Sequence, residues 1–232
     1  MKLLKNLALV FLTCVMTTSL FAQSDIKSYT FKKGEILDIL LLTTKSGTEK
    51  DFNKYKKTIF PFGIKKTYKP LPGFGIKKTT QGNIQPASFI LGKWDDLKNR
   101  EEFLAQIEGV VPDFHLQRRN IWSLFNLTYY EMPKNTSFEI DRNKYNVVTS
   151  YWKKETTSFK KFKELWLQKA KENGGKKILQ LTNGKSPLGY YHNPDILVIT
   201  QWDSKEEFDV FYKENLKMNH KGVLHINQFV LN

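Results

Sequence analysis

Residues 196–208 read ILVITQWDSKEEF, a run of apolar and β-branched residues followed by Trp-Asp, a serine and two glutamates. A continuous apolar run of this length is typical of a buried strand. The segment therefore predicts a strand from Ile196 to Trp202 and a helix from Ser204 to Met218. Glu206 and Glu207 would lie in the first turn of that helix, where the positive end of the helix dipole favours carboxylates.

The same pattern occurs in the first half of the chain. Residues 85–95, QPASFILGKWD, match residues 193–203, NPDILVITQWD, at an offset of 108. Further matches follow in the same order: Phe52 and Tyr55 with Phe159 and Phe162, Glu101-Glu102-Phe103 with Glu206-Glu207-Phe208, and His115 with His220. A shared order at a nearly constant offset indicates an internal repeat. We therefore interpret the chain as one αβ module in tandem duplication.

Each module is predicted to run strand, helix, strand, strand, helix, strand. In the first module, strands are expected at 36–43, 73–80, 87–94 and 122–132, with a helix that opens at 46–49 and that Pro61 helps to stop, and a second helix at 96–107. In the second module, strands are expected at 145–152, 178–182, 196–202 and 223–231. Its first helix would begin at a cap, Thr157 or Ser158, and end near Asn173, before two glycines.

This order of elements is the ferredoxin-like arrangement, an antiparallel sheet with both helices on one face. The predicted fold class is α+β, with two tandem ferredoxin-like modules (βαββαβ) at residues 34–132 and 143–232. Residues 133–142 are expected to link them. The two antiparallel sheets are expected to pack face to face as an intramolecular αβ barrel.

The N-terminus is typical of an export signal. Lys2 and Lys5 flank a short apolar run from Leu7 to Leu12, and small and polar residues lead to a cleavage point after Ala22. An uncleaved anchor is the alternative, but a membrane span needs about 20 apolar residues, and threonines interrupt this run from Thr13 onwards. We therefore expect residues 1–22 to be a signal peptide that is removed, and the mature protein to be periplasmic or secreted.

Cysteine content and charge exclude several classes of function. Cys14, the sole cysteine, lies inside the signal, so the mature chain has no thiol for a disulfide, a metal site or a nucleophile. The net charge is +14, with the lysines dispersed in pairs. Such a charge favours association with anionic surfaces. Because no nucleic-acid-binding motif, metal-ligand spacing, phosphate loop or GxSxG motif accompanies it, we expect no specific nucleic-acid binding and no metal site.

The segment 196–208, with His220 after its helix, resembles the dimeric αβ-barrel superfamily. That group includes antibiotic-biosynthesis-type monooxygenases, haem-degrading monooxygenases and uncharacterised relatives. The resemblance covers both halves, from Gly34 to Leu231. It implies a small apolar or planar ligand, with haem as a candidate cofactor. Haem-degrading members use an Asn on a strand, a Trp on a helix and a His that binds iron. In this chain the position of the Asn corresponds to Asn146, and that of the Trp falls near Phe211 and Gln106 in the two halves. The His corresponds to His220 and His115.

The histidines that recur in both halves, His220 and His115, are the candidate catalytic residues. Histidine binds metals and transfers protons near neutral pH, but a histidine at a helix end also stabilises the helix dipole without any ligand. The candidate ligand-binding residues, expected near a cavity, are Trp94, Trp202, Phe211 and His225. The tryptophans are equally well explained as core residues.

These observations lead to one hypothesis and one rival. The hypothesis is an exported αβ-barrel protein that binds a small ligand, as a cofactor-independent or haem-binding monooxygenase-like protein. The rival is a non-catalytic envelope or stress protein that uses its basic surface for association. Because one chain holds both modules, we expect a monomer or a weak homodimer rather than an obligate dimer.

Overall fold

The computed structural model describes residues 25–187 and 189–232, so the predicted signal peptide lies outside the described residues. The first half contains β2 (Ile36–Thr44), α1 (Glu49–Lys65), β3 (Lys69–Gln81), β4 (Ser88–Trp94), α2 (Leu97–Val110), α3 (Phe114–Ile121) and β5 (Trp122–Glu131). The second half contains β7 (Tyr145–Lys153), α4 (Thr156–Glu172), β8 (Lys176–Thr182), β9 (Ile196–Trp202), α5 (Lys205–Lys217) and β10 (Val223–Leu231). Two further strands, β1 (Ile26–Phe31) and β6 (Thr136–Asp141), stand apart from these halves.

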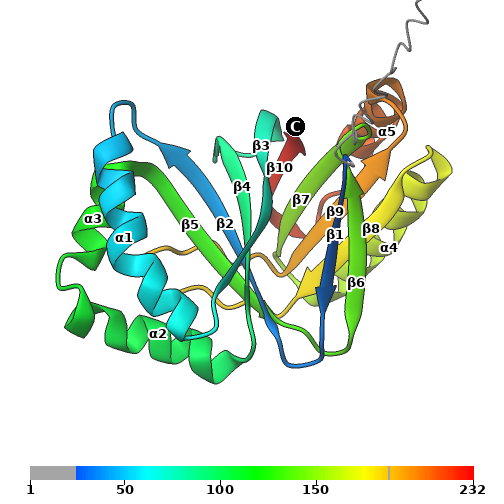
Figure 1. Cartoon of the computed structure of the whole chain (residues 1–232). Coiled ribbons are helices and arrows are strands. Elements are labelled where there is room, and N and C mark those ends of the chain that lie inside the picture. Colours follow the sequence, from blue (N-terminus) through cyan, green and yellow to red (C-terminus); the bar gives the residue numbers. More distant parts are fainter. Residues whose placement is uncertain (1–24, 188) are drawn as a thin grey trace, which may run out of the picture.

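Eight of the strands form one sheet in the order β5-β2-β4-β3-β10-β7-β9-β8 (Figure 1). Each half contributes four neighbouring strands in the same relative order, and antiparallel pairing of β3 with β10 joins the halves edge to edge. The α+β class is confirmed. The sequence predicted two sheets that pack as a barrel, but the described strands form one sheet that stays open between β5 and β8. At that opening, isolated bridges join Leu127 to Tyr191 and Tyr129 to Lys185 in the loop after β8.

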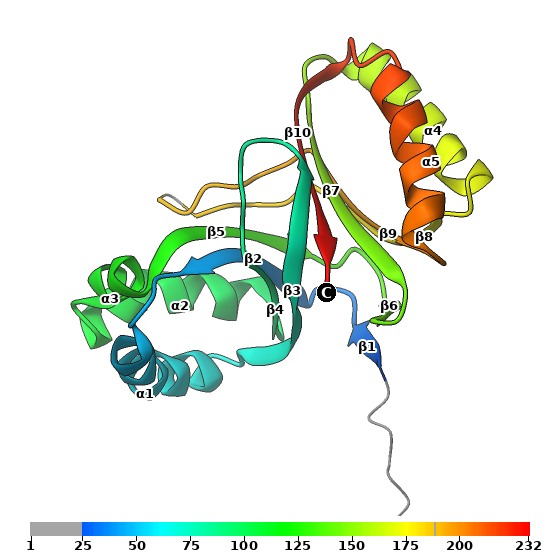
Figure 2. The ribbon, with the colours of Figure 1, turned by 90° about the horizontal axis from the view of Figure 1, so that it is seen from above.

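The strands are covered on both faces. Figure 2 shows α1, α2 and α3 against the outer face of the first half and α4 and α5 against the outer face of the second. The inner faces of the two halves share one apolar cluster, which contains Leu37 and Ile39 from β2 and Leu197 and Ile199 from β9. Because successive side chains of a strand point to opposite faces, the residues between these, such as Leu40 and Val198, face the helices.

A two-stranded ribbon, which the sequence analysis did not predict, closes one side of the inner cluster. β1 pairs antiparallel with β6, so that Tyr29 lies opposite Phe138. Both strands alternate, and the inward residues Tyr29, Phe31, Phe138 and Ile140 are buried in the inner cluster. The hydroxyl of Tyr29 also donates a hydrogen bond to the carbonyl of Pro72 at 2.8 Å. The segment 133–142, expected to be a linker, therefore carries a strand that packs on the core.

Three details of the helices differ from the predictions. Pro61 does not end α1, which continues to Lys65. A proline removes one N–H donor from a helix, but Ile59 before it and Gly63 after it are both buried, so the packing of the helix extends past the proline. The cap of α4 is neither Thr157 nor Ser158 but Glu155, whose carboxylate accepts from both of their N–H groups. The short helix α3 was not predicted. In the part of the chain that the structure describes, no helix has the length and hydropathy of a membrane span.

Replacing Phe31 by alanine tests whether the ribbon stabilises the core. Phe31 is 1% exposed, and truncation of such a phenylalanine should lower the free energy of unfolding by about 3–5 kcal/mol, as measured by urea denaturation. Ser28→Ala on the outward face of the same strand is the control. It removes an exposed hydrogen bond to Glu139 and should cost less than about 1 kcal/mol. Equal stabilities of the two variants would contradict the role given to the ribbon.

Candidate functional site

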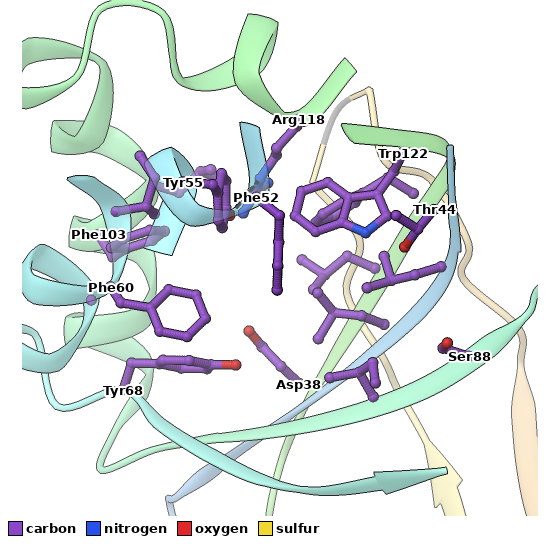
Figure 3. Close-up of a pocket in the computed structure, with 18 of the residues that line it drawn as sticks. Asp38, Thr44, Phe52, Tyr55, Phe60, Tyr68, Ser88, Phe103, Arg118 and Trp122 are labelled. Carbon is purple, nitrogen blue, oxygen red and sulfur yellow. Dashed lines mark hydrogen bonds between the residues drawn. The ribbon is translucent and has the colours of Figure 1, made fainter. Parts of the chain in front are cut away.

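A cavity of about 410 Å³ lies in the first half, between the outer face of the sheet and the helices α1, α2 and α3 (Figure 3). Side chains from three strands form its floor: Asp38, Leu40, Leu42 and Thr44 of β2, Ser88, Ile90 and Trp94 of β4, and Trp122, Phe125 and Leu127 of β5. Side chains from the helices form its roof: Phe52, Tyr55, Ile59 and Phe60 of α1, Phe103 and Leu104 of α2, and Arg118 of α3. Most of this lining is aliphatic or aromatic.

The cavity has an open end and a closed end, and β2 runs from one to the other. Thr44 lies at the end of β2, where the neighbouring Lys45, Glu49 and Phe52 are exposed. Asp38 lies six residues earlier on the same face and is buried. At about 3.3 Å per residue, this separation amounts to roughly 20 Å. The cavity is therefore elongated, with its deepest part at Asp38.

A buried ion pair lies at the closed end. The two carboxylate oxygens of Asp38 accept hydrogen bonds from Nε1 of Trp94 and from Nε of Arg100, each at 2.9 Å. The guanidinium of Arg100 also stacks over the ring of Tyr129, with its carbon 4.4 Å from the ring centroid. A buried charge is tolerated when it is paired and hydrogen-bonded. Arg100 and Trp94 thus hold Asp38 in place as a carboxylate facing the cavity.

Tyr68, directly before β3, points its hydroxyl toward the same end of the cavity (Figure 3). Its ring packs against Trp94, with the centroids 4.9 Å apart, and against Gly92 of β4. A Cβ atom on Gly92 would lie 2.5 Å from Cε2 of Tyr68, so the glycine makes room for the ring. Burial raises the pKa of Tyr68 well above its ordinary value, and the phenol stays protonated. No hydrogen bond joins this hydroxyl to any of the described residues.

Arg118 connects the cavity wall to the second half of the chain. Its Nε donates to the hydroxyl of Tyr55 at 3.1 Å, and its guanidinium lies over the rings of Phe125 and Tyr190. Tyr190 belongs to the loop between β8 and β9. Behind it, Nδ1 of His115 contacts the hydroxyl of Tyr190, and Nε2 of His115 lies 2.7 Å from Glu108. A loop of the second half thereby helps to fix the wall of the cavity in the first half.

The corresponding space in the second half is filled. Leu42 pairs with Ser88 in the first half, and Tyr151 pairs with Ile196 at the equivalent place in the second. By the match of the first helices, Ile59 corresponds to Trp166, which is buried against Tyr151 with the ring centroids 5.7 Å apart. Asp38 corresponds in the same register to Val147. Larger aromatic side chains therefore occupy the volume that the first half leaves open, and an uncharged valine stands in place of the carboxylate.

Comparison with known proteins places the architecture. No protein-family model and no curated protein matches the sequence significantly. A mutant chlorite dismutase from Candidatus Nitrospira defluvii superposes with a TM-score of 0.50 at 8% identity, over 87% of this chain and 93% of the other. At this identity the likeness concerns the fold, which is α+β and ferredoxin-like. An anthrone oxidase-like protein (TM-score 0.47, 13% identity, 88% and 94% coverage) and a candidate monooxygenase from Fusobacterium nucleatum (0.39, 12%, 87% and 93%) are more distant in shape.

Within this α+β fold, the residues predicted as functional are dispersed. Trp94 lines the closed end of the cavity. Trp202 and Phe211 are stacked in the filled core of the second half, with the centroids 4.9 Å apart. The histidines are not equivalent: His115 lies on α3, whereas Nδ1 of His220 lies 2.8 Å from the carbonyl of Met218, in the turn after α5. His225, on β10, packs against Trp152. Of these six residues, Trp94 alone belongs to the cavity lining.

The sequence analysis missed the polar groups of the cavity, which are Asp38, Tyr68, Arg100 and Arg118. A signal for the first was present, because Asp38 is the single charged residue in the apolar run ILDILLLTT of β2. A charge at a buried strand position requires a partner and often marks a site. No comparable pattern distinguishes Tyr68 or Arg118 from the other aromatic and basic residues of this chain.

The cavity does not fit haem. Haem iron is held in proteins by histidine, cysteine, methionine or tyrosine, and of these only Tyr55 and Tyr68 line the cavity. The hydroxyl of Tyr55 already accepts a hydrogen bond from Arg118. Burial raises the pKa of Tyr68, which opposes the phenolate that iron would bind. Among residues 25–187 and 189–232, no three His, Cys, Asp or Glu side chains are arranged to hold a metal ion.

His192 occupies a separate position, on the inner side of the sheet near the opening between β5 and β8. It is 3% exposed, with its Nδ1 3.3 Å from the hydroxyl of Thr128 and its ring against Trp152. Its Nε2 has no hydrogen-bond partner among the described residues. Burial lowers the pKa of His192 from 6.5 to about 4, and the nearby His225 adds to this effect. The imidazole is therefore neutral in the folded protein at neutral pH.

This neutral histidine should make the protein acid-sensitive. The unfolded chain takes up a proton at His192 as the pH falls below about 6.5, whereas the folded chain does so near 4. The free energy of unfolding therefore decreases as the pH falls from 6.5 to 4, and His192 causes no further decrease below pH 4. At ~1.4 kcal/mol per pKa unit, the loss is up to about 3 kcal/mol. His192→Gln should flatten the dependence of the unfolding free energy on pH, measured in urea from pH 7 to 4.5. Asn193→Gln, a neighbouring change without a titratable group, should keep the wild-type slope, and equal slopes for both variants would refute the assignment.

Proposed function

We propose that this protein binds a small, elongated and largely apolar molecule in the cavity of its first half. The observation that carries the proposal is the contrast between the two halves. In the first half, Leu42 and Ile59 line an open volume. In the second half, the equivalent positions hold Tyr151 and Trp166, which belong to a filled core. Empty volume in a core costs stability. A volume of about 410 Å³ is within the range of ligand-binding pockets.

Binding is the function that the geometry supports best, and an oxidation of the bound molecule would be an addition to it. The resemblance to monooxygenases implies such a reaction without a cofactor, and the rival hypothesis is a non-catalytic protein that associates through its basic surface. Oxygen uptake after addition of a bound ligand would support the enzyme. Binding to anionic vesicles by a protein whose cavity is blocked would support the rival.

We also propose that the chain is exported and that its two halves arose by duplication. Export is supported by the charged and apolar pattern of residues 1–22, and N-terminal sequencing of the mature protein should begin at Gln23. Duplication is supported by the shared order of the elements and by the equivalent strand order of the two halves. Related sequences aligned half against half should then match at offsets of 105 to 109, and a chance-level match would contradict the duplication.

Blocking the cavity should abolish binding. Leu40 lies in the middle of the floor, and Leu40→Trp should reduce the affinity for the neutral fluorescent probe N-phenyl-1-naphthylamine at least tenfold, because the indole occupies the space of the probe. Fluorescence titration measures this effect. The unfolding free energy should change by less than about 2 kcal/mol, because the added volume enters an open space rather than a packed one.

Leu216→Trp is the matched control. Leu216 is exposed on α5 in the second half, so the same substitution there should leave probe binding unchanged. Absence of saturable probe binding by the wild type, or equal affinities of both variants, would overturn the proposed function.

A further inference from the structure

We propose that the bound molecule carries a neutral hydroxyl group at one end, and that this hydroxyl lies at the closed end of the cavity between Tyr68 and Asp38. The inference rests on the proposed function and adds the chemical class of the ligand. It also fixes the orientation of the ligand, with its apolar body toward the mouth.

The distribution of polar groups along the cavity sets this orientation. The middle of the floor is aliphatic, with Leu40, Leu42 and Ile90. Buried Asp38 and Arg100 and half-buried Tyr68 meet at the closed end. Two other buried polar residues of the lining already have partners: Thr48 donates to the carbonyl of Lys45, and Arg118 donates to Tyr55. At the mouth, Thr44 and Lys45 are exposed to water. A polar group of the ligand would remain solvated at the mouth, whereas at the closed end it would meet the hydroxyl of Tyr68 and the remaining lone pairs of Asp38.

The hydrogen-bonding capacity of Tyr68 and Asp38 selects a hydroxyl. Tyr68 is a protonated phenol whose hydroxyl has no hydrogen bond to the described residues, so it can donate to a ligand oxygen. Each carboxylate oxygen of Asp38 accepts one hydrogen bond from the protein, and a carboxylate oxygen can accept two. A ligand group that accepts from Tyr68 and donates to Asp38 satisfies both residues. A hydroxyl does both with one atom.

Charged end groups fit this position poorly. A ligand carboxylate would lie beside the carboxylate of Asp38 in a buried environment, where like charges repel strongly. A ligand ammonium would compete with Arg100, which already neutralises Asp38 at 2.9 Å. An ether could accept from Tyr68 but has no proton for Asp38. The arrangement therefore discriminates against acids and amines more than against ethers.

A series of compounds with a linear ten-carbon chain tests the inference by displacement of N-phenyl-1-naphthylamine from the full mature chain. We expect 1-decanol to bind at least tenfold more tightly than decanoate or decylamine, and about three- to tenfold more tightly than decyl methyl ether. Tyr68→Phe should weaken the binding of 1-decanol about five- to tenfold, the effect of one neutral hydrogen bond.

Tyr130→Phe is the matched control, because Tyr130 is a buried tyrosine that lies in the inner cluster and not at the cavity. It should leave all four affinities unchanged, and circular dichroism should show that both variants are folded. If decanoate or decylamine binds as tightly as 1-decanol, or if Tyr68→Phe leaves the affinity for 1-decanol unchanged, the inference is wrong while the proposed function stands. If neither the probe nor any of the compounds binds, the proposed function itself fails.

Discussion

The central strands β2, β4, β7 and β9 are buried on both faces, and the rest of the structure follows from that condition. The outer face of each half requires helices, and the inner faces require each other and the ribbon of β1 and β6. A strand in such a sheet is apolar at nearly every position, so a polar residue within it must find partners inside the protein. Asp38 does so through Trp94 and Arg100. The ion pair is thus a consequence of the architecture, and the cavity is built around it.

The two halves place different side chains on equivalent backbones. The register of β2 with β4 equals that of β7 with β9. Leu42 nevertheless lines an open cavity, whereas Tyr151 packs against the ring of Trp166. One half therefore packs as an ordinary core, and the other retains a volume beside a fixed charge. Since both halves share the same strand order, the difference lies in a few side-chain volumes. The backbone arrangement is the same in both halves, and these side chains determine whether a half contains a cavity.

Much of the fold could be predicted from local patterns, whereas the site could not. Apolar runs ending in Trp-Asp located β4 and β9, and Ser204 was found at the start of α5 as expected. The strands β1 and β6 were not predicted, because each is short and its partner lies more than 100 residues away in the sequence. The match of His115 with His220 was misleading as a structural guide, because the additional helix α3 gives the first histidine a different setting. The cavity depends on how three helices sit over the sheet, which no local pattern encodes.

The pairing of strands that are distant in the sequence has a kinetic consequence. β1 pairs with β6, whose residues come about 110 positions later, and β3 pairs with β10 of the second half. Contacts between such distant segments form slowly, because a long loop must close before they contribute stability. On the ribosome, the central seam of the sheet cannot form before β10 has been synthesised. The order of synthesis therefore leaves the edge of β3 without its partner strand until both halves of the chain have been made.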